Sequence, residues 1–432
     1  MDIALVRRYC ESLDQLGYFN GSILISYKGE MIFSEGYGYA DHTFNIKNTR
    51  ETKFRIGSLT KAFTAMAILQ LEMKGLLNLE IGIDHYISDF PNGDKITIHQ
   101  LLCHMSGVMD YASSPDYWFK TMRLPTNIKE TINRIKEYPL EYEPGSGVMY
   151  SNSGYAILAY IIEQVSGLSY EQYLSMYIFK PLGMNNTGCD DGRTVIEDYA
   201  RGYTVNQEII NAEFIDMSIA KGAYGMYSTT TDLFLWDKAL YTDKLVSQSQ
   251  LDKMFTFHNR YCGYDWFYNK EFINGKDQTR WYHFGDVNGF TSYYIRYPEA
   301  ELSVIVLSNF NLTPVDQISH DIAKIVLEQE KMELEFINPI LISDDLIRSI
   351  IGTYESGDQK LNIFNENNRL FISIPKMYGV IYKYEIYPIE ISQETLKLRS
   401  KHLNEIFIIQ LTDYHLTYNN PYKISLVYKK VN

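Results

Sequence analysis

One long apolar stretch dominates the hydrophobic pattern of the chain, at residues 58–75 with the sequence SLTKAFTAMAILQLEMKG. The unbroken run from Ala65 to Leu69 leaves no continuous polar face, and a helix that is apolar nearly all round is a buried helix. Gly75 tolerates a left-handed cap, so the helix is predicted to end there. Ser58 and Lys61 stand at its start, three residues apart and therefore one turn apart on the same face.

Periodic and alternating patterns in the rest of the first 330 residues predict strands near both ends of this region and helices between them. The predicted strands lie at residues 21–27, 31–39, 291–297 and 302–308, and the predicted helices at residues 2–16, 98–104, 153–165, 170–179, 232–240 and 316–330. Residues 110–145 show no clear period and are expected to be irregular. This order predicts an α+β fold with a helical insertion, in which the sheet is completed from both ends of the region.

The pattern changes from about residue 346, where short runs alternate apolar and polar residues with Asn, Gly and Asp turns between them. Such runs are typical of a small antiparallel β domain, either a sandwich or a barrel. Residues 331–345 are interpreted as a linker. The predicted organisation is therefore a first domain at 1–330, a linker at 331–345 and a C-terminal β domain at 346–432.

Composition narrows the classes of function. The chain has 432 residues, of which 45% are hydrophobic and 22% charged, as in ordinary globular proteins. Its net charge of −13 argues against a nucleic-acid partner. The four cysteines form no C-x-x-C pair and no metal-binding cluster is apparent, so neither a metal nor a cofactor is expected.

No apolar run reaches the length of a signal peptide or a membrane span. The chain as written is therefore expected to be cytoplasmic, and a secreted location is the alternative if a leader was removed.

Three short motifs carry the candidate chemistry. S-x-x-K occurs at residues 58–61, 218–221 and 373–376, but only the first copy opens a buried helix. Y-x-N occurs as Tyr150-Ser-Asn152, in a turn just before a predicted helix, and H-x-G occurs once, as His283-Phe-Gly285.

In this order the motifs resemble those of the serine β-lactamase and penicillin-binding-protein superfamily. The Y-x-N motif resembles the second motif of one branch of this superfamily. That branch contains class C β-lactamases, D-alanyl-D-alanine carboxypeptidases, related esterases and D-aminopeptidases. The stretches LLCHMSG at 101–107, YEPG at 142–145 and PLGM at 181–184 are also similar, and the resemblance covers roughly residues 10–330. It implies a β-lactamase/transpeptidase-like sheet flanked by helices with a helical subdomain. Members of this group also carry a small C-terminal β domain that is lipocalin-like.

The catalytic residues expected from this resemblance are Ser58, Lys61 and Tyr150. A serine hydroxyl is a weak nucleophile and needs a base. Lys61 is expected to be desolvated, which lowers its pKa and makes the neutral amine available. Tyr150 can share the proton with Lys61, so the cluster is expected to titrate as a unit.

The expected substrate-binding residues are Asn152, His283, Gly285 and Asp286. Asn152 can hold Lys61 and donate to a substrate amide, and Gly285 suits a close approach of substrate to the strand. The resemblance implies an oxyanion hole formed by the backbone amides of Ser58 and Asp286.

Two of these residues depart from the pattern of the family. His283 replaces the lysine of the Lys-Thr-Gly motif seen in many members, and Asp286 replaces a small hydroxyl residue. A carboxylate at this point would repel an anionic substrate end, or attract a free amine.

The expected function is that of a serine hydrolase acting through an acyl-enzyme on β-lactams or D-alanyl peptides. A carboxylesterase or D-aminopeptidase on the same scaffold is the first alternative, and a non-catalytic binding or sensor protein is the second. The expected partner is a small-molecule or peptide substrate, β-lactams included. The sequence leaves the oligomeric state open.

Overall fold

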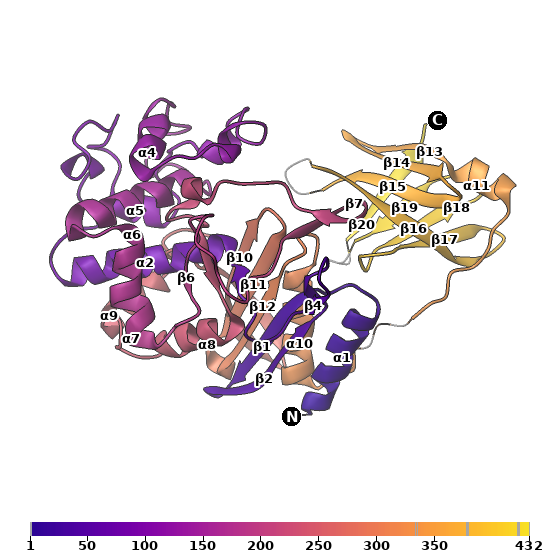
Figure 1. Cartoon of the computed structure of the whole chain (residues 1–432), viewed down its shortest axis with the longest axis horizontal. Helices are drawn as coiled ribbons and strands as arrows, with labels where there is room; N and C mark the ends of the chain where they lie inside the picture. The colour runs from indigo at the N-terminus through magenta and orange to yellow at the C-terminus, as the bar shows by residue number, and fades with distance from the viewer. Residues whose placement is uncertain (1, 333, 335, 377–379, 421–423, 432) are drawn as a thin grey trace.

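The computed structural model describes residues 2–332, 334, 336–376, 380–420 and 424–431, so positions 333 and 335 of the predicted linker lie outside the described residues. Figure 1 shows a larger body of helices around a sheet, and a smaller β-barrel beside it that is formed by the C-terminal part of the chain. No helix within the described ranges is both long and apolar enough to cross a membrane.

The larger body is built on a six-stranded antiparallel sheet with the order β2-β1-β12-β11-β10-β9. Its strands are β1 (Gly21–Tyr27), β2 (Glu30–Tyr37), β9 (Phe267–Ile273), β10 (Lys276–Val287), β11 (Phe290–Tyr297) and β12 (Leu302–Ser308). Strand β1 pairs with β12, which confirms the prediction that the sheet is completed from both ends of the region.

The two faces of this sheet belong to different cores. Ile23 and Ile25 pack with α1 (Ile3–Gln15) and α10 (Val315–Glu328) on one face. Leu24 points to the other face, into the core that contains the inserted helices. Alternation along a single strand therefore supplies both hydrophobic cores, as a strand buried on both faces requires.

The insertion between β2 and β9 is mainly helical (Figure 1). It contains α2 (Thr60–Met73), α3 (Ile98–Leu102), α4 (Ile128–Lys136), α5 (Asn152–Ser166), α6 (Tyr170–Leu174), α7 (Lys180–Leu182), α8 (Thr230–Ala239) and α9 (Gln248–Met254). Every residue from Thr60 to Leu71 is buried, which confirms that the apolar stretch is a core helix. The α-helix begins at Thr60 because Gly57–Leu59 forms a separate 3-10 turn, in which Gly57 has a φ of +53°.

Helix α4 corrects the expectation that residues 110–145 are irregular. The side chain of Asn127 caps it by accepting a hydrogen bond from the amide of Glu130 at 3.0 Å. Ile128, Ile132 and Ile135 form its buried face. The helix has nine residues, so its period extends over too few turns to be recognised among the aromatic residues around it.

Short strands brace the segment that leads into α2. One small sheet has the order β5-β8-β6, formed by β5 (Phe54–Arg55), β8 (Met226–Ser228) and β6 (Gly188–Cys189). A separate pair joins β3 (Tyr39–Asp41) to β4 (Ile46–Lys47). Directly after β5, the amide of Ile56 donates to the carbonyl of Met226 at 3.0 Å. The residues ahead of Ser58 are thus fixed by strand-like contacts before the helix starts.

The barrel confirms the predicted antiparallel β domain. It contains β13 (Gly352–Ser356), β14 (Gln359–Glu366), β15 (Arg369–Pro375), β16 (Ile381–Ile391), β17 (Thr395–Ser400), β18 (Ile406–Gln410), β19 (Leu416–Asn419) and β20 (Ser425–Lys430). It closes because β15 pairs with β16 as well as with β14. Helix α11 (Asp344–Ile350) precedes it and begins inside the predicted linker.

One strand of the larger body joins the barrel sheet. Strand β7 (Tyr203–Asn211) runs parallel to β16, and Asn206 and Gln207 pair with Lys383 and Tyr384. The barrel sheet is therefore not formed by residues 346–432 alone.

Candidate active site

Lys61 lies at the centre of a polar cluster at the start of α2. Its Nζ is 3.0 Å from Ser58 Oγ, 2.8 Å from Asn152 Oδ1 and 2.9 Å from the carbonyl oxygen of Ala223. The side chain is fully buried, and this desolvation lowers its pKa from 10.5 to about 8, against the opposing charges of Asp265 and Asp110. With this pKa, about a tenth of the amine is neutral at pH 7, and it lies within hydrogen-bonding distance of the serine hydroxyl.

Tyr150 covers this cluster from the start of α5. Lys61 Nζ lies 4.6 Å from the centroid of the Tyr150 ring, and the ring centroids of Tyr150 and His104 also lie 4.6 Å apart. Between Tyr150 and Asn152, Ser151 caps α5 by accepting a hydrogen bond from the amide of Gly154 at 3.2 Å. The N-terminal cap of α5 thus places both residues of the Y-x-N motif beside the lysine.

Asp110 fixes the orientation of Asn152. The Nδ2 of Asn152 donates to Asp110 Oδ2 at 3.0 Å, and its backbone amide donates to Asp110 Oδ1 at 3.2 Å. The carbonyl oxygen of the Asn152 side chain is consequently turned toward Lys61. Burial raises the pKa of Asp110, and hydrogen bonds from backbone amides oppose that shift.

Strand β10 packs directly against the turn that carries Ser58. A Cβ added to Gly285 would lie 2.0 Å from the carbonyl oxygen of Ile56, and one added to Gly57 would lie 2.4 Å from the amide nitrogen of Asp286. The space left by Gly285 is therefore occupied by the carbonyl of Ile56. This close packing brings the amide of Asp286 next to the Ser58 turn, where two backbone donors can hold an anionic oxygen.

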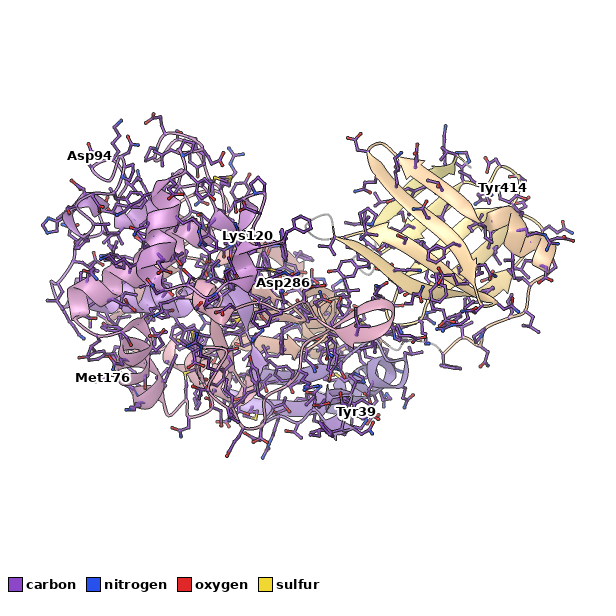
Figure 2. The ribbon with its side chains drawn as sticks, turned by 45° about the horizontal axis from the view of Figure 1, so that its top comes forward. Tyr39, Asp94, Lys120, Met176, Asp286 and Tyr414 are labelled. Atoms are coloured by element: carbon purple, nitrogen blue, oxygen red, sulfur yellow. The ribbon has the colours of Figure 1, made fainter. Side chains whose placement is uncertain are left out.

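Side chains alternate along β10. His283 is fully buried; its Nδ1 lies 2.6 Å from the carbonyl oxygen of Phe284 and its Nε2 lies 3.1 Å from Asp265 Oδ2. Phe284 and Asp286 share the opposite face, and Phe284 is 36% exposed. Loss of solvation raises the pKa of Asp286 to about 7. Figure 2 shows Asp286 on the part of the larger body that lies next to the barrel.

The other two S-x-x-K copies have structural partners. Lys221 forms ion pairs with Glu163 at 3.2 Å and Glu171 at 2.8 Å, and Lys376 pairs with Glu405 in the barrel. Neither lysine joins the Ser58 cluster. Helix context distinguishes the first copy from these two.

The structure brings together the seven residues selected from the sequence, and it adds contacts from residues that were not selected. These are the side chains of Asp110, His104 and Asp265 and the carbonyl of Ala223. Asp110 and Asp265 lie in loops, far in sequence from the residues they contact. Within the described ranges, no group of three or more histidine, cysteine or acidic residues is placed to hold a metal ion.

Comparison with known proteins adds a family match. The family described as Beta-lactamase matches residues 6–328. The putative penicillin-binding protein PbpX of Bacillus subtilis (strain 168) is 37% identical over 250 residues, which cover 56% of this chain and 60% of that protein. The teichoic acid D-alanine hydrolase of Staphylococcus aureus (strain MRSA252) is 30% identical, over 56% of this chain and 57% of that protein. The chain thus spans somewhat over half the length of these two relatives.

Solved structures share the fold. The octameric penicillin-binding protein homologue from Pyrococcus abyssi superposes with a TM-score of 0.67 at 24% identity, over 99% of this chain and 100% of that one. The D-amino acid amidase from Ochrobactrum anthropi SV3 has a TM-score of 0.66 at 25% identity, over 76% of this chain and 100% of that one. The likeness to the first of these includes the C-terminal barrel.

Proposed function

The chain belongs to the β-lactamase family, and on that premise we propose that it is a serine hydrolase that forms an acyl-enzyme at Ser58. The observation that carries the proposal is the 3.0 Å contact between Lys61 Nζ and Ser58 Oγ at a buried lysine whose pKa is lowered to about 8. A desolvated amine beside a hydroxyl is a base placed to activate a nucleophile.

In the proposed acylation, the neutral amine of Lys61 takes the proton of Ser58 as Oγ attacks the acyl carbon of the substrate. The oxygen of the tetrahedral intermediate accepts hydrogen bonds from the amides of Ser58 and Asp286. Collapse breaks the bond from the acyl carbon to the leaving nitrogen or oxygen. The proton taken from Ser58 passes to this leaving group through Tyr150 and Lys61.

Deacylation repeats these steps with water as the nucleophile. Tyr150 and Lys61 accept a proton from the water, the acyl–Oγ bond breaks, and Ser58 recovers its proton. The same residues thus serve both halves of the reaction, as microscopic reversibility requires for a symmetric acyl transfer.

The proposed substrates are β-lactams or D-alanyl peptides, as the penicillin-binding relatives suggest. The test is incubation of the protein with a fluorescent penicillin, followed by nitrocefin, p-nitrophenyl esters and D-amino-acid amides. We expect covalent labelling that is lost in Ser58→Ala, and turnover of at least one substrate class. Full activity of Ser58→Ala would overturn the proposal, and a wild-type protein that is neither labelled nor active on any of these substrates would favour a non-catalytic binding protein.

Asp286 favours a second candidate, hydrolysis of D-aminoacyl esters or amides that carry a free amine. Its side chain lies on the same face of β10 as Phe284, beside the proposed oxyanion site, and its pKa of about 7 leaves it half ionised at neutral pH. A carboxylate there can pair with the ammonium of a D-aminoacyl group. Two similar proteins are, by their names, a teichoic acid D-alanine hydrolase and a D-amino acid amidase.

Substrates with a free amine and the same substrates with an acetylated amine distinguish the two candidate functions. For Asp286→Asn we expect kcat/KM to fall about tenfold or more on D-alanine amides and esters with a free amine, because an ion pair is lost. The same substrates with an acetylated amine serve as the control, and their hydrolysis should change little. Equal losses on free and acetylated substrates would remove amine recognition from Asp286.

A further inference from the structure

Asp110 supplies hydrogen-bond acceptors to the start of α5 from a loop 42 residues earlier in the chain. Its Oδ2 accepts a hydrogen bond from Asn152 Nδ2 at 3.0 Å. Its Oδ1 accepts from two backbone amides, that of Asn152 at 3.2 Å and that of Ala112 at 3.3 Å. Three N–H donors around its two oxygens match an ionised carboxylate, which only accepts hydrogen bonds.

This carboxylate determines which way the side-chain amide of Asn152 faces. An asparagine amide has an acceptor end and a donor end, and Asp110 takes the donor end. The acceptor Oδ1 therefore faces Lys61, whose Nζ lies 2.8 Å away. The opposite orientation would set the amide oxygen against a carboxylate and the amide NH₂ against the lysine ammonium. Of the two N–H groups on Nδ2, one is used by Asp110 and the other is left to donate to a substrate.

The loop that carries Asp110 also contacts the segment that provides another acceptor for Lys61. The amide of Tyr111 donates to Ser153 Oγ at 2.9 Å, which docks the loop on α5. The hydroxyl groups of Tyr111 and Tyr224 lie 3.2 Å apart, and both side chains are buried. Tyr224 follows Ala223, whose carbonyl oxygen lies 2.9 Å from Lys61 Nζ. The position of Asp110 is therefore fixed against both segments that hold the lysine.

We propose that Asp110 is a positioning residue for the hydrolysis, because its carboxylate holds the Asn152 amide in the one orientation that offers an oxygen to Lys61 and an N–H to the substrate. This inference rests on the proposed function of Ser58 and Lys61. Asp110 acts through Asn152 and takes no part in the proton transfers. Its negative charge also reaches Lys61, where it works to raise the pKa of the amine against the larger effect of desolvation.

Other titratable groups face Lys61 from a loop and from the start of α5. Asp265, in the loop before β9, also works to raise the pKa of the lysine. The ring centroids of Tyr150 and Tyr155 lie 4.6 and 5.7 Å from Lys61 Nζ, and burial raises the pKa of Tyr155 well above its ordinary value. These groups are common to the wild type and to every Asp110 variant, so a displaced titration of Lys61 in such a variant reports the loss of the Asp110 charge.

The test uses Asp110→Ala in the full chain, with Asp110→Asn as a second variant that keeps the volume of the side chain. We expect the maximal acylation rate of Asp110→Ala to fall about tenfold or more, because the Asn152 amide can then turn away from the lysine. We expect the pH profile of both variants to move to lower pH, because removal of a negative charge lowers the pKa of Lys61 below about 8. A loss of general stability would lower the rate without moving the profile.

A double-mutant cycle tests whether Asp110 acts through Asn152. If it does, Asp110→Ala should cost about tenfold in the wild-type background but less than about twofold in a protein that already carries Asn152→Ala. Equal losses in the two backgrounds would overturn the proposal. An unchanged rate and pH profile in a folded Asp110 variant would do the same.

Asp216→Ala is the matched control. Asp216 is also a half-buried loop carboxylate that caps a 3-10 turn, Met217–Ala220, as Asp110 caps Tyr111–Ser113. Its hydrogen bonds go to the amide and hydroxyl of Ser218 rather than to the Lys61 cluster. Its variant should lose a helix cap and keep the wild-type acylation rate and pH profile. A profile that moves equally in Asp216→Ala would show that the displacement is not specific to Asp110, and the proposal would fail.

NMR of protein labelled at lysine distinguishes this inference from the proposed function. The pKa of Lys61 can be followed without any substrate, with Lys61→Arg assigning its signal. If the wild type is not labelled by penicillin at Ser58, the proposed function fails, whereas a lower Lys61 pKa in Asp110→Asn would still place the Asp110 carboxylate beside the lysine. Equal Lys61 pKa values in the wild type and in Asp110→Asn would overturn the inference whether or not Ser58 reacts.

Discussion

Burial of the Lys61 amine lowers the stability of the folded chain and makes the amine a better base. Its three oxygen partners are a hydroxyl, an amide and a backbone carbonyl, none of which carries a full negative charge. Because burial lowers its pKa from 10.5 to about 8, the unfolded chain binds this proton more tightly than the folded one. The free energy of unfolding should therefore rise with pH between these two values, by about 3 kcal/mol in total for this one group.

The same shift predicts the pH dependence of acylation. The neutral fraction of Lys61 is half at about pH 8 and falls tenfold for each unit below pH 7. We expect the rate of labelling by a fluorescent penicillin to rise with pH through an apparent pKa near 8, measured from pH 6 to 10. Because Ser58, Lys61 and Tyr150 titrate together, this apparent pKa belongs to the cluster. A rate that is flat over this range would contradict the assignment.

Replacement of the lysine tests its role as a base. Lys61→Arg keeps a cation that does not lose its proton, so we expect acylation to fall by about 10²-fold or more. Lys74→Arg, at the exposed end of the same helix, is the control and should acylate at the wild-type rate. Wild-type labelling by Lys61→Arg would remove the lysine from the mechanism.

Substitution of Gly285 tests the close packing of β10 against the turn that carries Ser58. A Cβ there would meet the carbonyl oxygen of Ile56 at 2.0 Å, so Gly285→Ala must displace the Ser58 turn or the strand. We expect a loss of about 1–3 kcal/mol in the free energy of unfolding, and acylation that falls further than the stability change explains. Gly154→Ala is the control, because its Cβ would meet its nearest neighbour at an ordinary 3.5 Å. Denaturant unfolding and labelling rates measure both effects.

Among the structural elements, α5 carries the Y-x-N residues of the candidate site at its N-terminus. Ser151 caps this helix between the two functional residues of the Y-x-N motif. For Ser151→Ala we expect a loss of about 1 kcal/mol in the free energy of unfolding and a reduced acylation rate, because Tyr150 and Asn152 lose their anchor.

Ser169→Ala gives the matched comparison. Ser169 caps α6 through a capping box with Gln172, away from the site. Its variant should lose similar stability and keep the wild-type acylation rate. If both cap variants reduce acylation equally, the effect of Ser151 is one of general stability.

Local patterns explain which elements could be predicted. The burial of α2 follows from the apolar run within one segment, and the pairing of β1 with β12 follows from the order of strands and helices along the chain. The α-helix starts at Thr60, two residues later than the sequence predicts, because the 3-10 turn before it depends on packing against β10. Asp110 and Asp265 could not be predicted, since they contact Asn152 and His104 from 42 and 161 residues away. No repeat or spacing within either loop indicates those contacts.

At the scale of the whole molecule, the barrel and the larger body share a core. Tyr203 and Val205 of β7, together with Phe310 after β12, belong to the apolar cluster inside the barrel and are each 5% exposed or less. Polar contacts surround this junction, including an ion pair of 2.6 Å between Arg369 and Glu208. The barrel is therefore expected to stabilise the larger body, which a domain on a free linker would not do.

The barrel also reaches the candidate site. Tyr382 of β16 accepts a hydrogen bond from Asn311 at 3.2 Å. Its pKa is raised by burial and, after that, by the nearby carboxylate of Asp286. The charge of Asp286 thus acts on a side chain of the barrel, which places the barrel close to the group proposed to recognise an amine.

Removal of the barrel tests whether it stabilises the larger body and whether it affects the pKa of Asp286. Residues 1–330 expressed alone would expose Tyr203, Val205 and Phe310, so we expect a lower unfolding temperature and a tendency to aggregate. A second truncated protein with these three residues replaced by serine should regain solubility without regaining the unfolding temperature. In that protein Asp286 is expected to be better solvated, so its pKa should fall from about 7 toward the ordinary value of a carboxyl group. The carboxylate would then stay ionised at lower pH, and hydrolysis of amine substrates should extend to lower pH. If the truncated proteins match the full chain in unfolding temperature and pH profile, the barrel is an independent domain and Asp286 takes its environment from the larger body alone.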